Sequence, residues 1–156
     1  MSKVVIDTSS FIRATLERDN TALNCLAFVL SNRQLIYTVE MAQELLVATY
    51  RVSIRKGKNP NFAFKMAATA LIKAKPVETK TRFPWCSDPD DAMFVECAID
   101  GQADFVISND HSLTTIKEYV TDEHALELIR DIEFVTPEEF LKIHTDKEEE
   151  TCLPEE

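Results

Sequence analysis

Short runs of β-branched and other apolar residues recur along the chain, and most of them end in an acid or in a residue that can start a helix. Such runs predict buried strands, because a strand that is covered on both faces is apolar at nearly every position. Strands are expected over residues 3–7, 35–38, 104–108 and 132–135. The stretch that begins at Val77 is poorly patterned, and it has room for one further strand.

Between these runs, apolar residues at helical spacing predict helices that begin and end at recognisable signals. Thr38 is expected to cap a long helix that runs to about Lys56, where Gly57 is the stop signal. Asp88 and Pro89 suit the cap and the first turn of another helix, over residues 88–100. Further helices are expected over residues 20–32, 61–75, 113–119 and 137–144, with Asn20, Ser112 and Thr136 suited to cap three of them. Residues 124–130 fit either a helix or a strand.

Strands that alternate with helices predict a three-layer α/β/α fold with a mostly parallel central sheet. The chain has 156 residues, which fits one domain, and we expect that domain to span residues 1–145. Residues 146–156 carry six acids and one lysine, which predicts a disordered acidic tail. The start of the chain does not resemble a signal peptide, and no apolar run reaches the roughly 18 residues that a membrane span needs.

The cysteine and glycine content narrows the function classes. None of the four cysteines forms a CxxC pair or has a histidine at zinc-finger spacing, so reduced thiols in a cytoplasmic protein are expected. Only two glycines occur, Gly57 and Gly101, which excludes the glycine-rich loops that bind nucleotide phosphates.

The net charge is −10, but the charge is unevenly distributed along the chain. Residues 51–82 carry nine basic residues and one acid, a net charge of +8, which leaves −18 for the rest. A local basic surface, rather than the total charge, decides whether a polyanion can bind. A solvated helical face explains the same pattern equally well. The basic residues expected to contact RNA or a partner protein are Arg51, Arg55, Lys56, Lys58 and Lys65.

Two acids follow predicted strands. Asp7 stands at the carboxyl end of the first strand, and Asp110 comes just after a later one. In open parallel sheets, ligands bind at the carboxyl ends of strands, near the point where the strand order reverses. Asp91, in the first turn of a helix, and Glu44, early in the helix after the second strand, can face the same edge. The four acids are therefore expected to converge there.

Converging carboxylates repel one another. A pair of like charges about 4 Å apart costs on the order of 4 kcal/mol at an effective dielectric near 20, in a domain whose whole stability is roughly 5–15 kcal/mol. Protonation or bound cations must relieve this repulsion, and hard oxygen ligands suit Mg²⁺ or Mn²⁺. Such ions lower the pKa of a bound water and polarise a phosphoryl oxygen, as phosphodiester hydrolysis requires. The expected catalytic and metal-binding residues are Asp7, Glu44, Asp91 and Asp110, and Glu40 competes with Glu44 for its role.

The ordered set of motifs resembles the PIN-domain family, and within it the VapC-like branch, the toxin components of toxin–antitoxin pairs. The motifs lie at residues 4–9 (VVIDTS), 44–47 (ELLV), 88–91 (DPDD), 104–110 (DFVISND) and 134–141 (FVTPEEFL). The similarity extends over about residues 3–143. Each motif alone is weak, but their order along the chain is specific.

The resemblance implies a metal-dependent ribonuclease that leaves a 5′-phosphate and a 3′-hydroxyl. It assigns the acidic quartet to the four acids named above, and it assigns to Ser9 and Ser108 hydroxyl groups that orient the site. Asp88 is interpreted mainly as a helix cap that supports the site. A small antitoxin protein and a homodimer are typical of the family, so both are expected as partners of this chain.

One departure from the family pattern bears on activity. The VapC-like branch often carries a further acid two residues after the position of Asp110, and this chain has Ser112 there. A lost ligand would weaken one of two metal sites, so the alternative function is a catalytically weak or inactive module that binds RNA or a partner protein. An aspartyl-phosphate domain is a third hypothesis, but it would need a second acid at Ser9 and a strand-end lysine.

Overall fold

Five parallel strands form the central sheet in the computed structural model, which describes residues 1–151 and the side chains as far as Thr145. The strands are β1 (Lys3–Ile6), β2 (Gln34–Tyr37), β3 (Lys75–Pro76), β4 (Phe105–Ile107) and β5 (Glu133–Val135). Their order across the sheet is β3-β2-β1-β4-β5, and every neighbouring pair is parallel. The chain builds outward from β1 to β3 and then returns to the other side of β1, so the strand order reverses between β1 and β4.

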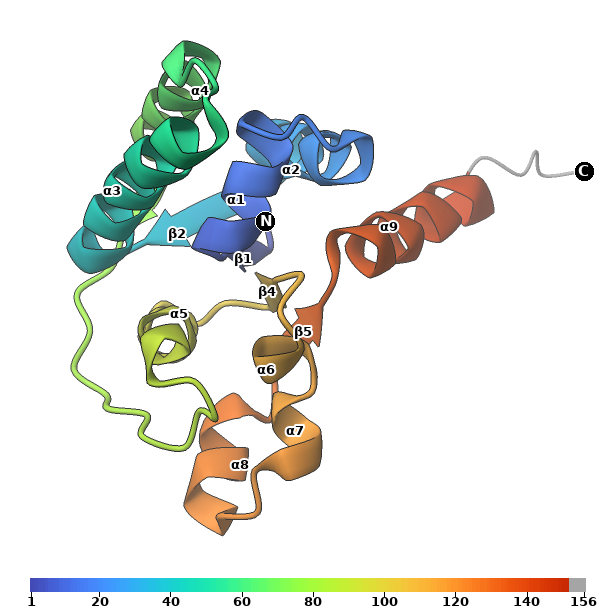
Figure 1. Ribbon diagram of the computed structural model, residues 1–156. Coiled ribbons are helices and arrows are strands. Elements are labelled where there is room, and N and C mark those ends of the chain that lie inside the picture. The colour runs from blue at the N-terminus through green and yellow to red at the C-terminus, as the bar shows by residue number, and fades with distance from the viewer. Residues whose placement is uncertain (152–156) are drawn as a thin grey trace, which may run out of the picture.

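Helices cover both faces of this sheet (Figure 1). The elements are α1 (Thr8–Thr15), α2 (Asn20–Asn32), α3 (Val39–Lys56), α4 (Asn61–Lys73), the 3-10 helix η1 (Pro89–Asp91), α5 (Ala92–Asp100), α6 (His111–Thr114), α7 (Ile116–Tyr119), α8 (Glu123–Ile129) and α9 (Pro137–Thr151). One face packs against α1, α2, α4 and α9, and the other packs against α5 to α8. The predicted three-layer α/β/α fold is confirmed, and the sheet of the described residues is wholly parallel.

The inner positions of β1 and β4, in the middle of the sheet, are apolar because successive residues enter different cores. Val4 and Ile6 belong to the core under α1 and α2, whereas Val5 between them belongs to the core under α5. In β4, Val106 and Ile107 divide in the same way. All of these side chains are buried, which explains the continuous apolar runs in the sequence.

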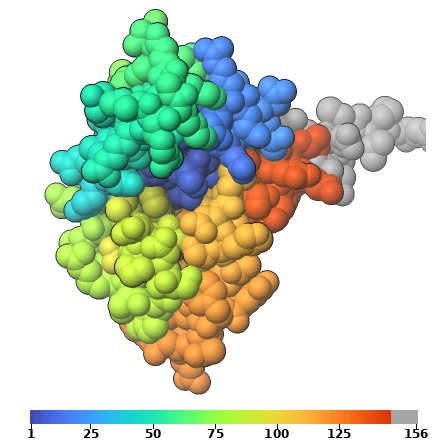
Figure 2. Space-filling view, viewed as in Figure 1, coloured from blue at the N-terminus to red at the C-terminus, as the bar shows by residue number. Residues whose placement is uncertain are grey.

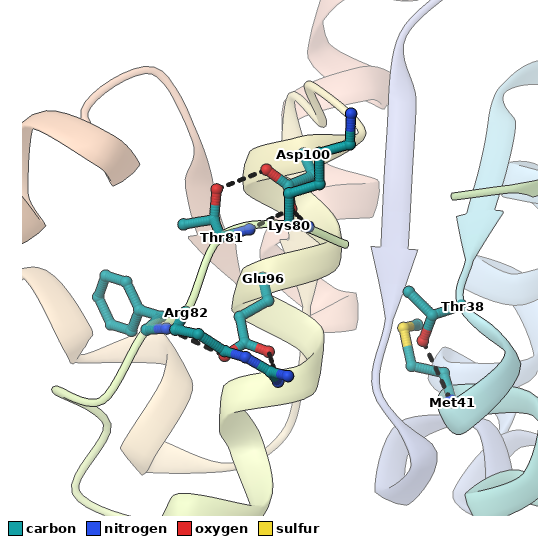
Figure 3. A network of polar contacts seen from close by, with 8 residues as sticks. Thr38, Met41, Lys80, Thr81, Arg82, Glu96 and Asp100 are labelled. Carbon is teal, nitrogen blue, oxygen red and sulfur yellow. Dashed lines mark hydrogen bonds and ion pairs between the residues drawn. The ribbon is translucent and has the colours of Figure 1, made fainter. Parts of the chain in front are cut away.

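The connection from β3 to η1 is fastened to α5 by two carboxylates (Figure 3). The Asp100 carboxylate accepts hydrogen bonds from the backbone N–H groups of Lys80 and Thr81, at 2.6 and 2.8 Å, and from the Thr81 hydroxyl at 2.6 Å. The Glu96 carboxylate accepts one from the N–H of Phe83, at 2.9 Å. These bonds fix the path of the segment that leads to Asp88.

Several predicted boundaries were wrong. The helix expected over residues 61–75 ends earlier, at Lys73, and β3 follows it at Lys75–Pro76. The third strand therefore comes before the stretch at Val77 that had room for one. The last helix does not end near His144 but continues to Thr151. Of the tail expected to be disordered, residues 146–156, the first six residues form the end of α9, and residues 152–156 lie outside the described residues.

Two predicted caps were also wrong, because a preceding aspartate has the better geometry. Asp19 rather than Asn20 caps α2, since its carboxylate accepts a hydrogen bond from the N–H of Ala22. Asp110 rather than Ser112 caps α6, and the helix expected over residues 113–119 is divided into α6 and α7. The ambiguous residues 124–130 are mostly helical, in α8. Helix α1 was not predicted at all.

Other signals are confirmed. Thr38 caps α3, and Gly57 ends it in the left-handed conformation, at φ 62°, which favours glycine. The Thr136 hydroxyl accepts a hydrogen bond from the N–H of Glu139 at the start of α9. Within the described residues, no helix is both long enough and apolar enough to cross a membrane.

Candidate metal centre and active site

Asp7 lies at the carboxyl end of β1 and caps α1. Its Oδ1 accepts a hydrogen bond from the N–H of Ser10 at 2.9 Å, and its Oδ2 accepts hydrogen bonds from the hydroxyls of Ser9 at 3.0 Å and Ser108 at 2.5 Å. The side chain is 3% exposed. Burial raises the pKa of Asp7 above its usual value, although the hydrogen bonds from the serines work in the opposite direction.

A second layer of hydrogen bonds ties Asp7 to the segment that follows β4. The Ser108 hydroxyl accepts a hydrogen bond from the N–H of Asp110 at 2.8 Å while it donates to Asp7. The Ser10 hydroxyl accepts hydrogen bonds from the backbone N–H and the side-chain amide of Asn109, both at 3.0 Å. Because β1 and β4 are neighbours, these contacts join the segments that follow the two strands, at the place where the strand order reverses.

Asp91 ends the 3-10 helix η1 and faces the same region. It is 7% exposed, and burial raises its pKa to about 6. A hydrogen bond from the Ser112 hydroxyl lowers that pKa, whereas the charges of Asp110, Asp88 and Asp7 raise it further. The negative charges of Asp110, Asp88 and Asp7 thus act directly on the Asp91 carboxyl, as expected for carboxylates that converge.

Three of these acids can hold one ion. Asp88, Asp91 and Asp110 each offer a carboxylate oxygen, and these three atoms lie within 4.8 Å of one another. Asp88, which the sequence indicated mainly as a cap, does accept the N–H of Asp90 at 3.0 Å, yet it also belongs to this cluster. An all-oxygen set of this kind suits a hard divalent cation.

The four predicted acids Asp7, Glu44, Asp91 and Asp110 all line one cleft, of about 570 Å³. Glu44 reaches it from α3, whereas its competitor Glu40 does not line it. Among the described residues, none of the four acids forms an ion pair with lysine or arginine. We call this hollow the acidic cleft. In Figure 2 it falls where the blue N-terminal residues are set between α3 and the segment that includes α5.

Basic side chains stand at the wall of the acidic cleft. Arg55 and Lys56, both expected from the sequence to contact RNA or a partner, line it together with Arg13. Lys56 pairs with Glu17, which also lines the cleft. The other three basic residues expected to make this contact do not line the cleft: Arg51, Lys58 and Lys65.

Sequence reasoning missed Ser10, Asn109 and Arg13. Ser10 and Asn109 are 99 residues apart, so only the pairing of β1 with β4 brings them together. Arg13 lies outside the basic segment, on a helix that the pattern did not predict. A signal was available for α1, because aspartate is a preferred N-cap residue, and Asp7 accepts a hydrogen bond from the backbone N–H of Ser10.

Comparison with known proteins agrees with this architecture. A family profile described as PIN domain matches residues 3–112. Among solved structures, a chain in the crystal structure of VapBC2 from Rickettsia felis, bound to a DNA fragment from their promoter, is similar in fold. Its TM-score is 0.51 at 14% sequence identity, over 86% of this chain and 98% of that one. No curated protein matches the chain.

The matched residues include all four predicted acids that line the acidic cleft: Asp7, Glu44, Asp91 and Asp110. They also include both strands that flank the reversal of strand order, β1 and β4. The profile covers well over half of the 156 residues, and the fold agrees with it independently. On these grounds the chain belongs to the PIN-domain family.

Proposed function

We propose that this chain is a metal-dependent endoribonuclease that hydrolyses phosphodiester bonds in RNA. The observation that carries the proposal is the set of acids in the acidic cleft. Asp91 and Asp110 line the cleft together with Asp7 and Glu44, and their oxygens lie within 4.8 Å of each other and of an oxygen of Asp88. PIN-domain membership supports nuclease chemistry, and the absence of a cationic partner among the described residues supports a role for bound metal.

The donor atoms fit Mg²⁺ or Mn²⁺, because every one of them is a carboxylate oxygen. Asp7, Glu44, Asp91 and Asp110 would hold the ions, with Asp88 in support. Within the part of the chain that the structure describes, Asp7 Oδ1 accepts one hydrogen bond, from the N–H of Ser10, so it has a lone pair left for a ligand. When bound, the ions would supply Lewis-acid polarisation of a phosphoryl oxygen and a lower pKa for the attacking water.

The chain itself orients the acids and binds the substrate. Ser9 and Ser108 fix the Asp7 carboxylate in one orientation, and the N–H of Asp110 is fixed by the same Ser108 hydroxyl. Arg13 and Arg55 at the cleft wall would bind phosphates on either side of the scissile bond. The other basic residues proposed to contact RNA or a partner protein are Arg51, Lys56, Lys58 and Lys65.

The test is a cleavage assay with purified full-length protein and Mn²⁺ or Mg²⁺. Single-stranded and structured RNA should be cut, and Asp91→Asn should abolish cutting and weaken Mn²⁺ binding in calorimetry. Asp131→Asn, which changes the charge equally at an exposed site outside the acidic cleft, should leave both unchanged. A folded, Mn²⁺-loaded chain that cuts no RNA would reject the proposal. Matched DNA substrates would show whether the 2′-hydroxyl is required.

A second candidate is a PIN-fold module that binds RNA or a partner protein with weak activity or none. The specific observation behind it is Ser112, whose hydroxyl donates to Asp91 where a further acid would offer a metal ligand. Calorimetry distinguishes the two candidates. If the chain bound RNA but neither Mn²⁺ nor Mg²⁺, the binding module would be favoured. In that case Ser112→Asp, which supplies a further acid, should create metal binding.

We further propose that the chain is the toxin of a toxin–antitoxin pair and acts in the cytoplasm. The similarity of its fold to a chain of the VapBC2 complex supports an antitoxin protein as a partner. Expression of the wild-type chain alone should slow growth, and Asp7→Asn should relieve the effect. If cells that express Asp7→Asn grew as slowly as cells that express the wild-type chain, toxicity through nuclease activity would be contradicted.

A further inference from the structure

Ser112 contacts two of the three clustered acids of the proposed metal centre. Its backbone N–H donates to Asp110 Oδ1 at 3.1 Å, and its hydroxyl donates to Asp91 Oδ2. Its carbonyl oxygen accepts a hydrogen bond from the Tyr119 hydroxyl at 2.6 Å. Ser112 therefore holds two carboxylates with its own polar groups, and Tyr119 in turn holds Ser112.

The same Tyr119 hydroxyl reaches the segment that supplies the third clustered acid. It accepts a hydrogen bond from the backbone N–H of Ser87 at 3.3 Å, one residue before Asp88. A phenolic hydroxyl has one hydrogen to donate and lone pairs that accept, so both contacts can form at once. Tyr119 thus joins the segment before η1 to α6, and each of the three acids is bonded to, or follows directly after, a residue that it holds.

The Tyr119 hydroxyl has a fixed place in the fold. Tyr119 is the last residue of α7, which lies beside α6 (Figure 1). Its side chain is half-buried and packs against the core under α5. The ring is therefore held by packing, and its hydroxyl is presented at one place between the two segments.

Packing does not fix Asp88 in the same way. Phe83, earlier in its segment, is 1% exposed, and the ring of Trp85 packs on it with the ring centroids 5.1 Å apart. Ser87 and Asp88, in contrast, are exposed. The place of the Asp88 carboxylate therefore depends on hydrogen bonds, and the contact of Ser87 with the Tyr119 hydroxyl ties this part of the segment to α6.

A bound metal ion makes the position of Asp88 important. Mg²⁺ takes oxygen ligands at about 2.0–2.1 Å in near-octahedral geometry, and a ligand must be held within about 0.5 Å of its working position. The clustered carboxylates repel one another, and Asp88 is the exposed member, so repulsion favours its displacement toward solvent. A neutral hydroxyl restrains it without adding a positive charge that would compete with the ion.

We propose that Tyr119 is a positioning residue of the metal centre, whose hydroxyl holds Asp88 in place against the other two acids of the cluster. Tyr119 does not line the acidic cleft, and it acts on the ion indirectly, through Ser87 and Ser112. This inference rests on the proposed function, because it requires that the acids bind a divalent cation. It gives Asp88 the role of a ligand, and it makes Ser112 part of the support of the site.

The first measurement is the affinity of the folded, full-length protein for Mn²⁺, by isothermal titration calorimetry. Tyr119→Phe keeps the ring and its packing and removes the hydroxyl. The dissociation constant for Mn²⁺ should therefore rise about 10-fold or more, as for other residues that orient metal ligands. Tyr50→Phe is the control, because it removes the same atom from an exposed tyrosine of α3 outside the acidic cleft. Its dissociation constant should equal that of the wild type.

The decisive measurement combines Tyr119→Phe with Asp88→Asn. Asparagine is also a preferred N-cap, so Asp88→Asn keeps the start of η1 and removes one charged ligand. Alone, it should weaken Mn²⁺ binding about 10-fold or more. In the Asp88→Asn background, Tyr119→Phe should change the Mn²⁺ dissociation constant less than about threefold, because no charged ligand is left for the hydroxyl to position.

Electron paramagnetic resonance supplies a second readout that a change in stability alone would not produce. At saturating Mn²⁺, the spectra of Tyr119→Phe and Asp88→Asn should differ from that of the wild type and resemble each other, because both ions lack the same ligand. Tyr50→Phe should give the wild-type spectrum. A wild-type spectrum from Tyr119→Phe would overturn the positioning role.

The outcomes separate this inference from the proposed function. If the wild-type chain binds no Mn²⁺, both are rejected. If it binds Mn²⁺ and Tyr119→Phe binds the ion equally tightly, only the positioning role is rejected, and the metal-dependent ribonuclease stands. A loss in Tyr119→Phe that keeps its full size in the Asp88→Asn background also overturns the role, because the hydroxyl then acts elsewhere in the fold.

Discussion

At the scale of single residues, the Ser108 hydroxyl has the most demanding position in the site. It lies between two segments that each supply an acid, accepting from the N–H of Asp110 and donating to Asp7. The residue is fully buried. Without the hydroxyl, the N–H of Asp110 would lose its acceptor, and Asp7 Oδ2 would keep only the hydrogen bond from Ser9. Polar groups beside a fully buried residue are costly to leave unpaired.

Ser108→Ala should therefore lower the free energy of unfolding of the metal-free protein by about 1–3 kcal/mol. Urea unfolding followed by circular dichroism measures this change. The control is Ser9→Ala, because Ser9 also donates to Asp7 but is exposed and can be replaced by water. The loss for the control should stay below about 1 kcal/mol. Equal losses for both variants would show that burial of the Ser108 hydroxyl adds nothing.

Asp91 makes the stability of the metal-free protein depend on pH. Its pKa is about 6 in the folded chain, chiefly because of burial, and 3.8 is its ordinary value. The folded state therefore holds this proton more tightly than the unfolded state does. The resulting stabilisation is fully present below pH 3.8 and is lost as the pH rises through about 6.

Between these limits, the free energy of unfolding should fall with rising pH, and Asp91→Asn should make the fall shallower. Asp7, whose pKa is also raised by burial, contributes in the same direction and remains in the variant. Chemical unfolding at a series of pH values, with a chelator present, measures the slope. Saturating Mn²⁺ should reverse the trend above pH 6, because the ion prefers the ionised carboxylates. A slope unchanged by Asp91→Asn would contradict the assignment.

The sequence predicted the acids better than the groups that support them. Asp7 and Asp110 could be located because a strand end is a local pattern and parallel strand ends share one edge. The cluster formed by Asp88 with Asp91 and Asp110 depends on the path of the chain through η1, which no spacing rule gives. The contact of Ser10 with Asn109 could not be predicted either, since it requires the register of β1 against β4.

At the scale of elements, the predictable helices were those with local signals at both ends. Helix α3 was predicted with its cap and its stop because Thr38 and Gly57 act on neighbouring backbone groups. Strand β3 was misplaced because its two residues, Lys75 and Pro76, are held by pairing with β2 rather than by any pattern of their own. A pattern of apolar residues cannot predict this strand, because both of its residues are exposed at the edge of the sheet.

The segment between β3 and η1 has neither helix nor strand, and Asp100 is its main anchor. The pKa of Asp100 is lowered, because the hydrogen bonds from Thr81 and Lys80 outweigh the effect of burial, which would raise it. Asp100→Ala removes three hydrogen bonds, two of them from backbone N–H groups. The segment should then move away from α5 more often.

Hydrogen exchange should detect that motion as faster exchange of the amides of residues 80–83 in Asp100→Ala, with a loss of about 1–3 kcal/mol in the free energy of unfolding. Asp104→Ala is the matched control, because Asp104 accepts one backbone hydrogen bond, from Lys3, at a different place in the fold. Its exchange in residues 80–83 should match that of the wild type. Faster exchange in both variants would indicate general destabilisation rather than release of this segment.

At the scale of the whole molecule, the alternation of strands and helices was enough to predict the layers, and the sheet order places the acids. The chain carries a net charge of −10, and nine of its 17 basic residues lie within residues 51–82, from the end of α3 through α4 to the segment after it. This distribution sets the acidic cleft beside a basic wall that includes Arg55. The proposed ribonuclease would need both, because the acids would hold cations while the basic groups would bind the RNA backbone.

The basic residues at the wall of the acidic cleft, Arg13, Arg55 and Lys56, lead to a quantitative prediction for RNA binding. In a chelating buffer, which prevents cleavage, the affinity for single-stranded RNA should fall as salt is added, because bound lysine and arginine release counterions. Arg55→Gln removes one phosphate contact, so the slope of log affinity against log salt should become shallower by about 0.7. Lys117→Gln, on α7 and outside the acidic cleft, removes an equal charge and should leave the slope unchanged. Fluorescence anisotropy at four or more salt concentrations measures both slopes. Identical slopes for the two variants would mean that RNA affinity depends on the net charge of the chain and that RNA does not contact Arg55 at the wall of the cleft.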